Sequence, residues 1–375
     1  MKIKQEAEDF VVEEVISLPE LKEGGEYTYF WLTKRNWTTV RAIQQISKKC
    51  GVSIKRFKFA GTKDKVAVTK QLVSVWKVDP SKLEKVKLKD IDIEVVGRGD
   101  ERVSLGDLEG NDFTIIVKDL SESELKTAKE RKDVVSFGFP NYFGEQRFGR
   151  GNTHLVGRSI LLGDLEGAVK LLLAKVGEGE LEETKKFRED CQKRWGEWDS
   201  LLKDVPKYLG IESSLLNYLV KNKTDFGGAI RKLPKKIRKL YIHAYQSYLF
   251  NRALSKYLKE KYDCDCLKFF DFKLCFPKDN VFEEVEFEVP GFATKLKSDV
   301  GIILKKLLEE EGIDLSIFEC VRMPELKSEG TKRKGFIKPV DFNVKEVDNN
   351  LVVSFFLDKG SYATILLRYL FGRGL

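Results

Sequence analysis

The chain has 375 residues, of which 42% are hydrophobic, so it is long enough for two domains with separate cores. No apolar run approaches the roughly 18 residues of a membrane-spanning helix, and residues 1–10 lack the apolar stretch of a signal peptide, so we expect a cytoplasmic protein. The 67 basic residues exceed the 59 acidic ones, and the net charge of +8 favours a polyanionic partner without requiring one.

Residues 1–150 are expected to be mixed α/β. Aromatic and β-branched residues favour several short strands, at 10–12, 27–32, 57–59, 66–76 and 111–118. A helix is expected that Thr38 or Thr39 caps and that ends at Cys50, because Gly51 suits the left-handed residue that ends a helix. Its apolar face is predicted to hold Val40, Ile43 and Ile46. A charged helix is expected at about 121–133.

The segment 136–152 (SFGFPNYFGEQRFGRGN) interleaves glycines, aromatics and arginines with little periodicity, which indicates a loop. Apolar residues then recur at helical spacing through the middle of the chain, and Asp164 and Asp225 are expected to cap two of these helices. The helices are expected at 165–176, 213–222, 236–259 and 298–311, with strand-like pieces at 267–276 and 281–289. Strands return at 336–345 and 351–358, followed by a final helix.

This order of elements predicts an α+β protein in which a helix-rich unit is inserted into a strand-rich one. We expect a discontinuous catalytic domain formed by residues 1–152 and 335–375. Residues 153–334 are expected to form the inserted domain.

Histidine and cysteine are scarce. Only His154 and His243 are present, so a Ser-His or Cys-His nucleophile would have to use one of them, and a His-rich metal site is excluded. The six cysteines include no CxxC pair, and Cys264 and Cys266 lack a matching second half, so we expect buried thiols and no metal site.

Asp64 is the carboxylate that the sequence singles out. It lies at the tip of a strand–turn–strand unit, where an aspartate is ordinarily a turn former. Here Lys63 and Lys65 flank it, and positive neighbours favour the ionised form. The surrounding basic residues are Lys55, Arg56, Lys58, Lys63, Lys65 and Lys70. An ionised carboxylate within a basic surface suits attack on a phosphate-bearing substrate, and does not suit a general acid.

Two other segments allow a functional and a structural interpretation. The first is the 136–152 loop. Its aromatic rings and the guanidinium groups of Arg147 and Arg150 could stack on bases, and the arginines could also bind phosphate. Alternatively, the rings could belong to the core and the arginines could form salt bridges. In the segment 110–113, Asn111 could hold a uracil edge with Phe113 behind it, or could simply begin a strand.

The chain resembles the TruD family of pseudouridine synthases along nearly its whole length, and looks like an archaeal member. The resemblance rests on six ordered segments: AEDFVVEE (7–14), FAGTKDKVAVTKQ (59–71), GNDF (110–113), GFPNYFGEQRFG (138–149), AYQSYLFN (244–251) and GSYATILLR (360–368). It implies a catalytic domain with a bent, mostly antiparallel sheet and a TRUD insertion domain. It also implies an isomerase that converts uridine to pseudouridine in tRNA, chiefly at uridine 13, without cofactor or metal.

The resemblance further implies the site. Asp64 matches the catalytic aspartate of the family. The substrate-binding residues of the family match Lys4, Phe10, Asn111, Phe113 and Tyr362, the last of which is often phenylalanine in bacterial relatives. To these we add Lys63 as a substrate-binding residue that could, like Lys4, keep Asp64 ionised. Lys58, Lys65, Arg147 and Arg150 are expected to bind RNA.

Such an enzyme must flip the uridine out of its stack, cut the C1′–N1 bond and rejoin the ring through C5. Asp64 would either attack C1′ or remove the 2′ proton, and the sequence does not distinguish these routes. A tRNA partner and a monomer are expected. Two alternatives are an RNA-binding protein without catalysis and a carboxylate hydrolase, although a hydrolase needs two carboxylates on opposite sides of the bond.

Overall fold

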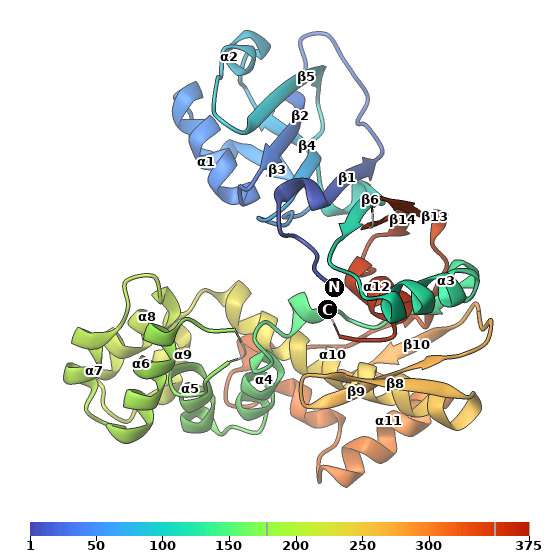
Figure 1. Cartoon of the computed structure of the whole chain (residues 1–375). Coiled ribbons are helices and arrows are strands. Elements are labelled where there is room, and N and C mark those ends of the chain that lie inside the picture. The colour runs from blue at the N-terminus through green and yellow to red at the C-terminus, as the bar shows by residue number, and fades with distance from the viewer. Residues whose placement is uncertain (178, 349, 375) are drawn as a thin grey trace. The chain divides into compact units, whose positions relative to one another are not determined.

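The computed structural model describes residues 1–177, 179–348 and 350–374, and the chain forms two compact units (Figure 1). The first unit comprises residues 1–139 and 337–373, and the second comprises residues 140–336. These bounds differ from the predicted ones chiefly at 140–152. That segment packs within the second unit: the Tyr142 hydroxyl donates to the Cys275 carbonyl at 2.8 Å, and the rings of Phe143 and Phe250 are 5.6 Å apart.

The first unit is built on an eight-stranded sheet, in the order β13-β14-β6-β1-β4-β2-β5 with β3 on β4. Its pairs are antiparallel except β1 with β4, so the predicted α+β class and mostly antiparallel sheet are confirmed. The strands are β1 (Phe10–Ile16), β2 (Tyr27–Arg35), β3 (Phe57–Phe59), β4 (Val68–Trp76), β5 (Ile91–Gly99), β6 (Leu108–Val117), β13 (Val340–Val347) and β14 (Asn350–Asp358).

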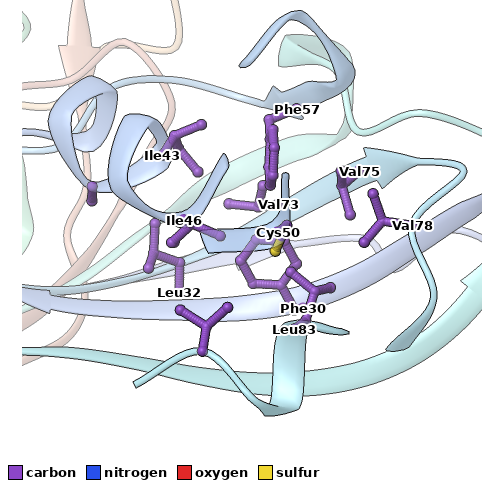
Figure 2. Packing of buried hydrophobic residues seen from close by; sticks show 12 residues of the cluster. Phe30, Leu32, Ile43, Ile46, Cys50, Phe57, Val73, Val75, Val78 and Leu83 are labelled. Carbon is purple, nitrogen blue, oxygen red and sulfur yellow. The ribbon is translucent and has the colours of Figure 1, made fainter. Parts of the chain in front are cut away.

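Helix α1 packs on this sheet much as predicted. The Thr38 side chain caps it, Gly51 ends it in the left-handed conformation, and Ile43 and Ile46 lie in one cluster with Phe30 of β2 (Figure 2). Val40 is 44% exposed, so its predicted place on the buried face is wrong. The buried face of α1 begins at Thr39. Because each residue turns the helix by about 100°, Val40 points away from that face. The helices here are α1 (Thr39–Cys50), α2 (Pro80–Glu84), α3 (Glu122–Phe137) and α12 (Ala363–Phe371).

The second unit is rich in helices. Asp164 caps α5 by accepting a hydrogen bond from the Gly167 amide, and Asp225 caps α9 through the Gly228 amide, as predicted. The helices are α4 (Thr153–Leu161), α5 (Leu165–Leu173), α6 (Glu182–Lys193), α7 (Trp198–Asp204), α8 (Gly210–Leu219), α9 (Phe226–Lys232), α10 (Lys235–Lys261) and α11 (Asp299–Glu310). The strands are β8 (Cys264–Phe269), β9 (Phe272–Pro277), β10 (Glu286–Val289) and β11 (Thr331–Lys334). Among residues 1–177, 179–348 and 350–374, none of the helices has the length and apolar character needed to cross a membrane.

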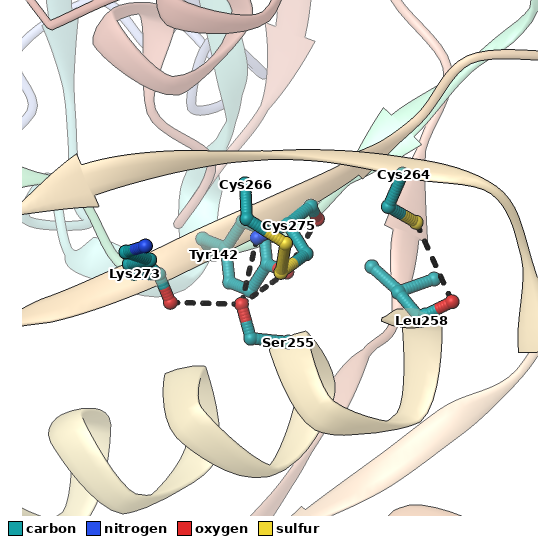
Figure 3. Close-up of a disulfide and its surroundings, with 7 residues drawn as sticks. All are labelled: Tyr142, Ser255, Leu258, Cys264, Cys266, Lys273 and Cys275. Carbon is teal, nitrogen blue, oxygen red and sulfur yellow. Dashed lines mark hydrogen bonds between the residues drawn. A yellow bond between two sulfur atoms is a disulfide. The ribbon is translucent and has the colours of Figure 1, made fainter. Parts of the chain in front are cut away.

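The expectation of free thiols fails at one pair of cysteines. The predicted strand at 267–276 is a hairpin that turns between β8 and β9, and its register sets Cys266 directly opposite Cys275. The two are joined as a disulfide beside Tyr142 and Ser255 (Figure 3). Sequence spacing alone did not show this pairing, because it depends on where the chain turns.

Candidate active site

Asp64 lies in the loop between β3 and β4, where two lysines contact it. Its side chain is 30% exposed, and the Lys4 ammonium lies 3.4 Å from Oδ1. The Lys34 ammonium donates a hydrogen bond of 2.7 Å to the backbone carbonyl of Asp64. One cation therefore faces the carboxylate, while another holds the main chain that positions it.

The loop before Asp64 is held by a short chain of polar contacts. The Thr39 hydroxyl, at the start of α1, accepts a hydrogen bond from the Lys63 amide at 3.0 Å and donates to Gln71 Oε1 at 2.8 Å. The Gln71 amide in turn donates to the Gly61 carbonyl at 3.0 Å. Because Thr39 and Gln71 are buried, these bonds fix the main chain on both sides of the turn.

Beside this loop, Lys63 connects two residues that face each other across the sheet. The register of β1 and β6 sets Glu14 opposite Asn111. The Lys63 ammonium lies 3.2 Å from Glu14 Oε1 and donates to Asn111 Oδ1 at 2.5 Å. Burial raises the pKa of Glu14, and the Lys63 charge and the Leu72 amide only partly oppose this. Of the two lysines expected to keep Asp64 ionised, Lys4 forms an ion pair with it, whereas Lys63 contacts Glu14 and Asn111.

Sequence reasoning did not assign roles to Lys34 and Glu14, although both carry a detectable signal. Each stands at the inward phase of its strand, Lys34 after Phe30 and Leu32 and Glu14 after Phe10 and Val12. A charged residue at an inward position is rare unless it has a partner. Lys34 is 1% exposed, and burial lowers its pKa to about 8, although the Asp64 charge opposes this effect.

The predicted aromatic residues of this unit form a row across the sheet. The rings of Phe10 and Phe113 meet edge to face at 6.2 Å, and Phe113 stacks on Phe355 of β14 at 5.3 Å. Phe355 was not predicted, but it stands at the inward phase of its strand. Phe10 is 2% exposed, and the Lys4 ammonium lies 3.9 Å from its ring centroid. A base can therefore stack on that face of Phe10 only if Lys4 moves.

The other predicted residues lie in different places. Tyr362 is half-buried and immediately precedes α12, and Lys58 and Lys65 are exposed near the Asp64 loop. Arg147 and Arg150 belong to the second unit. Most rings of the 136–152 segment are buried, so the core interpretation is correct for them: Phe139, Tyr142, Phe143 and Phe148.

The two arginines of that segment differ in their contacts. The Arg147 guanidinium lies 5.4 Å from the Phe143 ring centroid. Arg150 forms an ion pair with Glu180, a buried carboxylate that also binds Arg188. RNA binding by Arg150 remains a prediction, and an RNA phosphate would have to compete with Glu180 for the Arg150 guanidinium.

The comparisons with known proteins identify the family. A family model described as tRNA pseudouridine synthase D (TruD) matches residues 1–370. The chain belongs to the TruD family. The family expected from the six sequence segments, and with it the class of pseudouridine-forming isomerases, is confirmed.

Relatives in this family match almost end to end. The chain is 36% identical to the "Probable tRNA pseudouridine synthase D" of Methanosarcina acetivorans, over 98% of this chain and 91% of that protein. It is 34% identical to the tRNA pseudouridine synthase D of Aquifex aeolicus, over 99% of this chain and 98% of that protein. A crystal structure of the Methanosarcina mazei TruD protein aligns with a TM-score of 0.75 at 34% identity, over 99% of this chain and 93% of that one.

Proposed function

We propose that this TruD protein isomerises uridine 13 of tRNA to pseudouridine, with the Asp64 carboxylate as the group that acts on the ribose. The reaction class follows from membership in the family. The role of Asp64 is supported by one observation above all: its carboxylate lies 3.4 Å from the Lys4 ammonium in a loop that Lys34 holds from behind.

The Lys4 ammonium lies 3.4 Å from the Asp64 carboxylate, and partial burial strengthens their attraction relative to bulk water. Both chemical routes use this carboxylate: attack on C1′ forms a bond to the sugar, whereas removal of the 2′ proton yields a glycal. In either route the C1′–N1 bond breaks, and its electron pair leaves with the uracil ring.

The neighbouring polar cluster suits the departing uracil. Asn111 accepts from the Lys63 ammonium through its carbonyl oxygen, so its amide N–H groups are left to donate to a uracil oxygen. The Lys63 charge beside them opposes the negative charge that develops on the ring. We assign stacking on the flipped base to Tyr362 and Phe113, and to Phe10 once Lys4 has moved.

The remaining features are also proposals. Lys58, Lys65, Arg147 and Arg150 would bind RNA phosphates, whose charges the basic surface attracts. Residues 140–336 would act as the TRUD insertion domain that contributes to tRNA binding. The enzyme would work as a cytoplasmic monomer, without a metal or an organic cofactor.

The decisive experiment measures tritium release from tRNA labelled at uracil C5. Asp64→Asn should abolish release while tRNA binding persists, because the amide cannot act as nucleophile or base. Asp100→Asn is the matched control, since Asp100 forms a surface ion pair with Lys22 at 2.6 Å. A tRNA without uridine at position 13 should release no tritium. Full activity of Asp64→Asn would refute the assignment, and wild-type binding without release would indicate a non-catalytic RNA-binding protein.

A further inference from the structure

Two of the six family segments, 138–149 and 244–251, belong almost wholly to the second unit, where both line one cavity of about 280 Å³. Such a volume is slightly below the roughly 300 Å³ at which pockets for drug-sized ligands begin, so it suits a small group. All residues that line it belong to the second unit.

Among the described residues, none forms a hydrogen bond or an ion pair with the Arg147 side chain, which lines this cavity. The Nε atom of its guanidinium is buried. Leaving a buried donor unsatisfied carries a free-energy cost, which is larger for a charged group. A bound group that accepts from this guanidinium would remove the cost.

A second arginine explains why Arg147 is not simply a packing residue. The Arg333 guanidinium lies 4.1 Å from the Phe143 ring centroid, closer than that of Arg147 at 5.4 Å. Arg333 also donates to the Asn141 carbonyl at 2.8 Å and to Asn141 Oδ1 at 2.6 Å. Arg333 thus packs on Phe143 and binds Asn141, whereas the N–H groups of Arg147 can still donate to a ligand.

The other polar groups around the cavity favour an anion. His243 is exposed at its edge, and the charges that act on the imidazole are those of Arg147 and Lys239, both cations. Ser247 donates to the His243 carbonyl and one N–H of Gln246 donates to the Pro290 carbonyl, so these two N–H and O–H groups are already used. Arg147 is therefore the charged donor that the cavity offers, with His243 beside it.

We propose that this cavity binds a backbone phosphate of the RNA substrate, with Arg147 as the principal donor and His243 beside it. A guanidinium presents parallel N–H groups that match two phosphate oxygens, which an ammonium cannot reproduce. The inference rests on the proposed function in that the ligand is RNA. It places one specific phosphate contact in the second unit, separate from the Asp64 chemistry.

The test measures tRNA affinity against salt concentration for the wild type, Arg147→Gln, Arg147→Lys and Arg322→Gln. Loss of one phosphate contact should weaken binding about tenfold to 100-fold and lower the magnitude of the salt slope by about 1. Arg147→Lys should retain the slope but bind more weakly than wild type. Arg322 is an exposed arginine of the same unit outside the cavity, so its variant should match the wild type.

Each result has a definite meaning. An unchanged affinity and slope for a folded Arg147→Gln would overturn the proposal, as would an equal loss in Arg322→Gln. If Arg147→Gln does not fold, His243→Gln provides the measurement, and a wild-type affinity for it would overturn the proposal. Salt-dependent binding through Arg147 in a protein that releases no tritium would refute the proposed function and leave this site standing.

Discussion

Replacing Lys63 with methionine is expected to destabilise the first unit by about 3 kcal/mol, near the low end of the cost of breaking a buried ion pair. The side chains of Lys63 and Glu14 are 8% and 0% exposed, and their charged atoms are 3.2 Å apart. Methionine keeps the aliphatic length but leaves the carboxylate buried without its cation. The low end applies because the Leu72 amide still donates to Glu14 at 2.9 Å.

The loss of stability in Lys63→Met should grow with pH, because Glu14 becomes charged as pH rises. Burial raises the pKa of Glu14 in the folded protein above its ordinary value of 4.5. The folded chain then binds this proton more tightly than the unfolded chain, so stability falls as pH rises from 4.5 through the raised pKa. The Lys63 charge lowers the pKa of Glu14 in the folded protein. Removing Lys63 therefore raises this pKa further and widens the pH range over which stability falls. Lys63→Met should therefore lose more stability at about pH 8 than at about pH 5.

Urea unfolding of the wild type, both single variants and the double variant at the two pH values measures this coupling. Adding Glu14→Gln to Lys63→Met removes the stranded charge and should recover about 1–2 kcal/mol at the higher pH. A double variant no more stable than Lys63→Met, or a loss that is equal at both pH values, would show that Glu14 is not held as a buried carboxylate by this lysine.

Three further predictions concern the same unit. Burial lowers the pKa of Lys34 to about 8, so wild-type stability should rise relative to Lys34→Met between about pH 8 and pH 10 in urea unfolding; parallel curves would contradict this. Tyr362→Ala should reduce kcat/KM about tenfold to 100-fold more than Tyr362→Phe, since base stacking contributes about 1–3 kcal/mol, and equal losses would argue against stacking. Thr39→Val should destabilise by about 1–3 kcal/mol, because the Lys63 amide and Gln71 lose a hydroxyl partner, and a wild-type unfolding midpoint would refute that role.

Local patterns predicted helices and their caps well and failed where a contact depends on how strands turn and pair. The helix that ends at Gly51 and the caps at Asp164 and Asp225 follow from residues only a few positions apart. The pairing of Cys266 with Cys275 depends on the turn between two strands, and free thiols were wrongly expected.

The catalytic candidate shows the same division. Asp64 stood out in the sequence through its flanking lysines and the family segment around it. The fold was needed to show that Lys4, 60 positions away along the chain, forms an ion pair with it. The inward phase of Lys34 was visible in the sequence of its strand, but the carbonyl that it holds was not.

By itself the sequence determined the family, the class of fold and most of the helices, and it singled out Asp64 as the candidate carboxylate, because these depend on residue type and short-range periodicity. Only the tertiary structure decided that Lys63 joins Glu14 to Asn111, two residues brought opposite each other by strand register. It also decided that Arg147, and not Arg150 or Arg333, lacks an internal hydrogen-bond partner within the described residues. Such assignments arise from the competition of many side chains for the same few atoms, and that competition is settled only when the segments pack together.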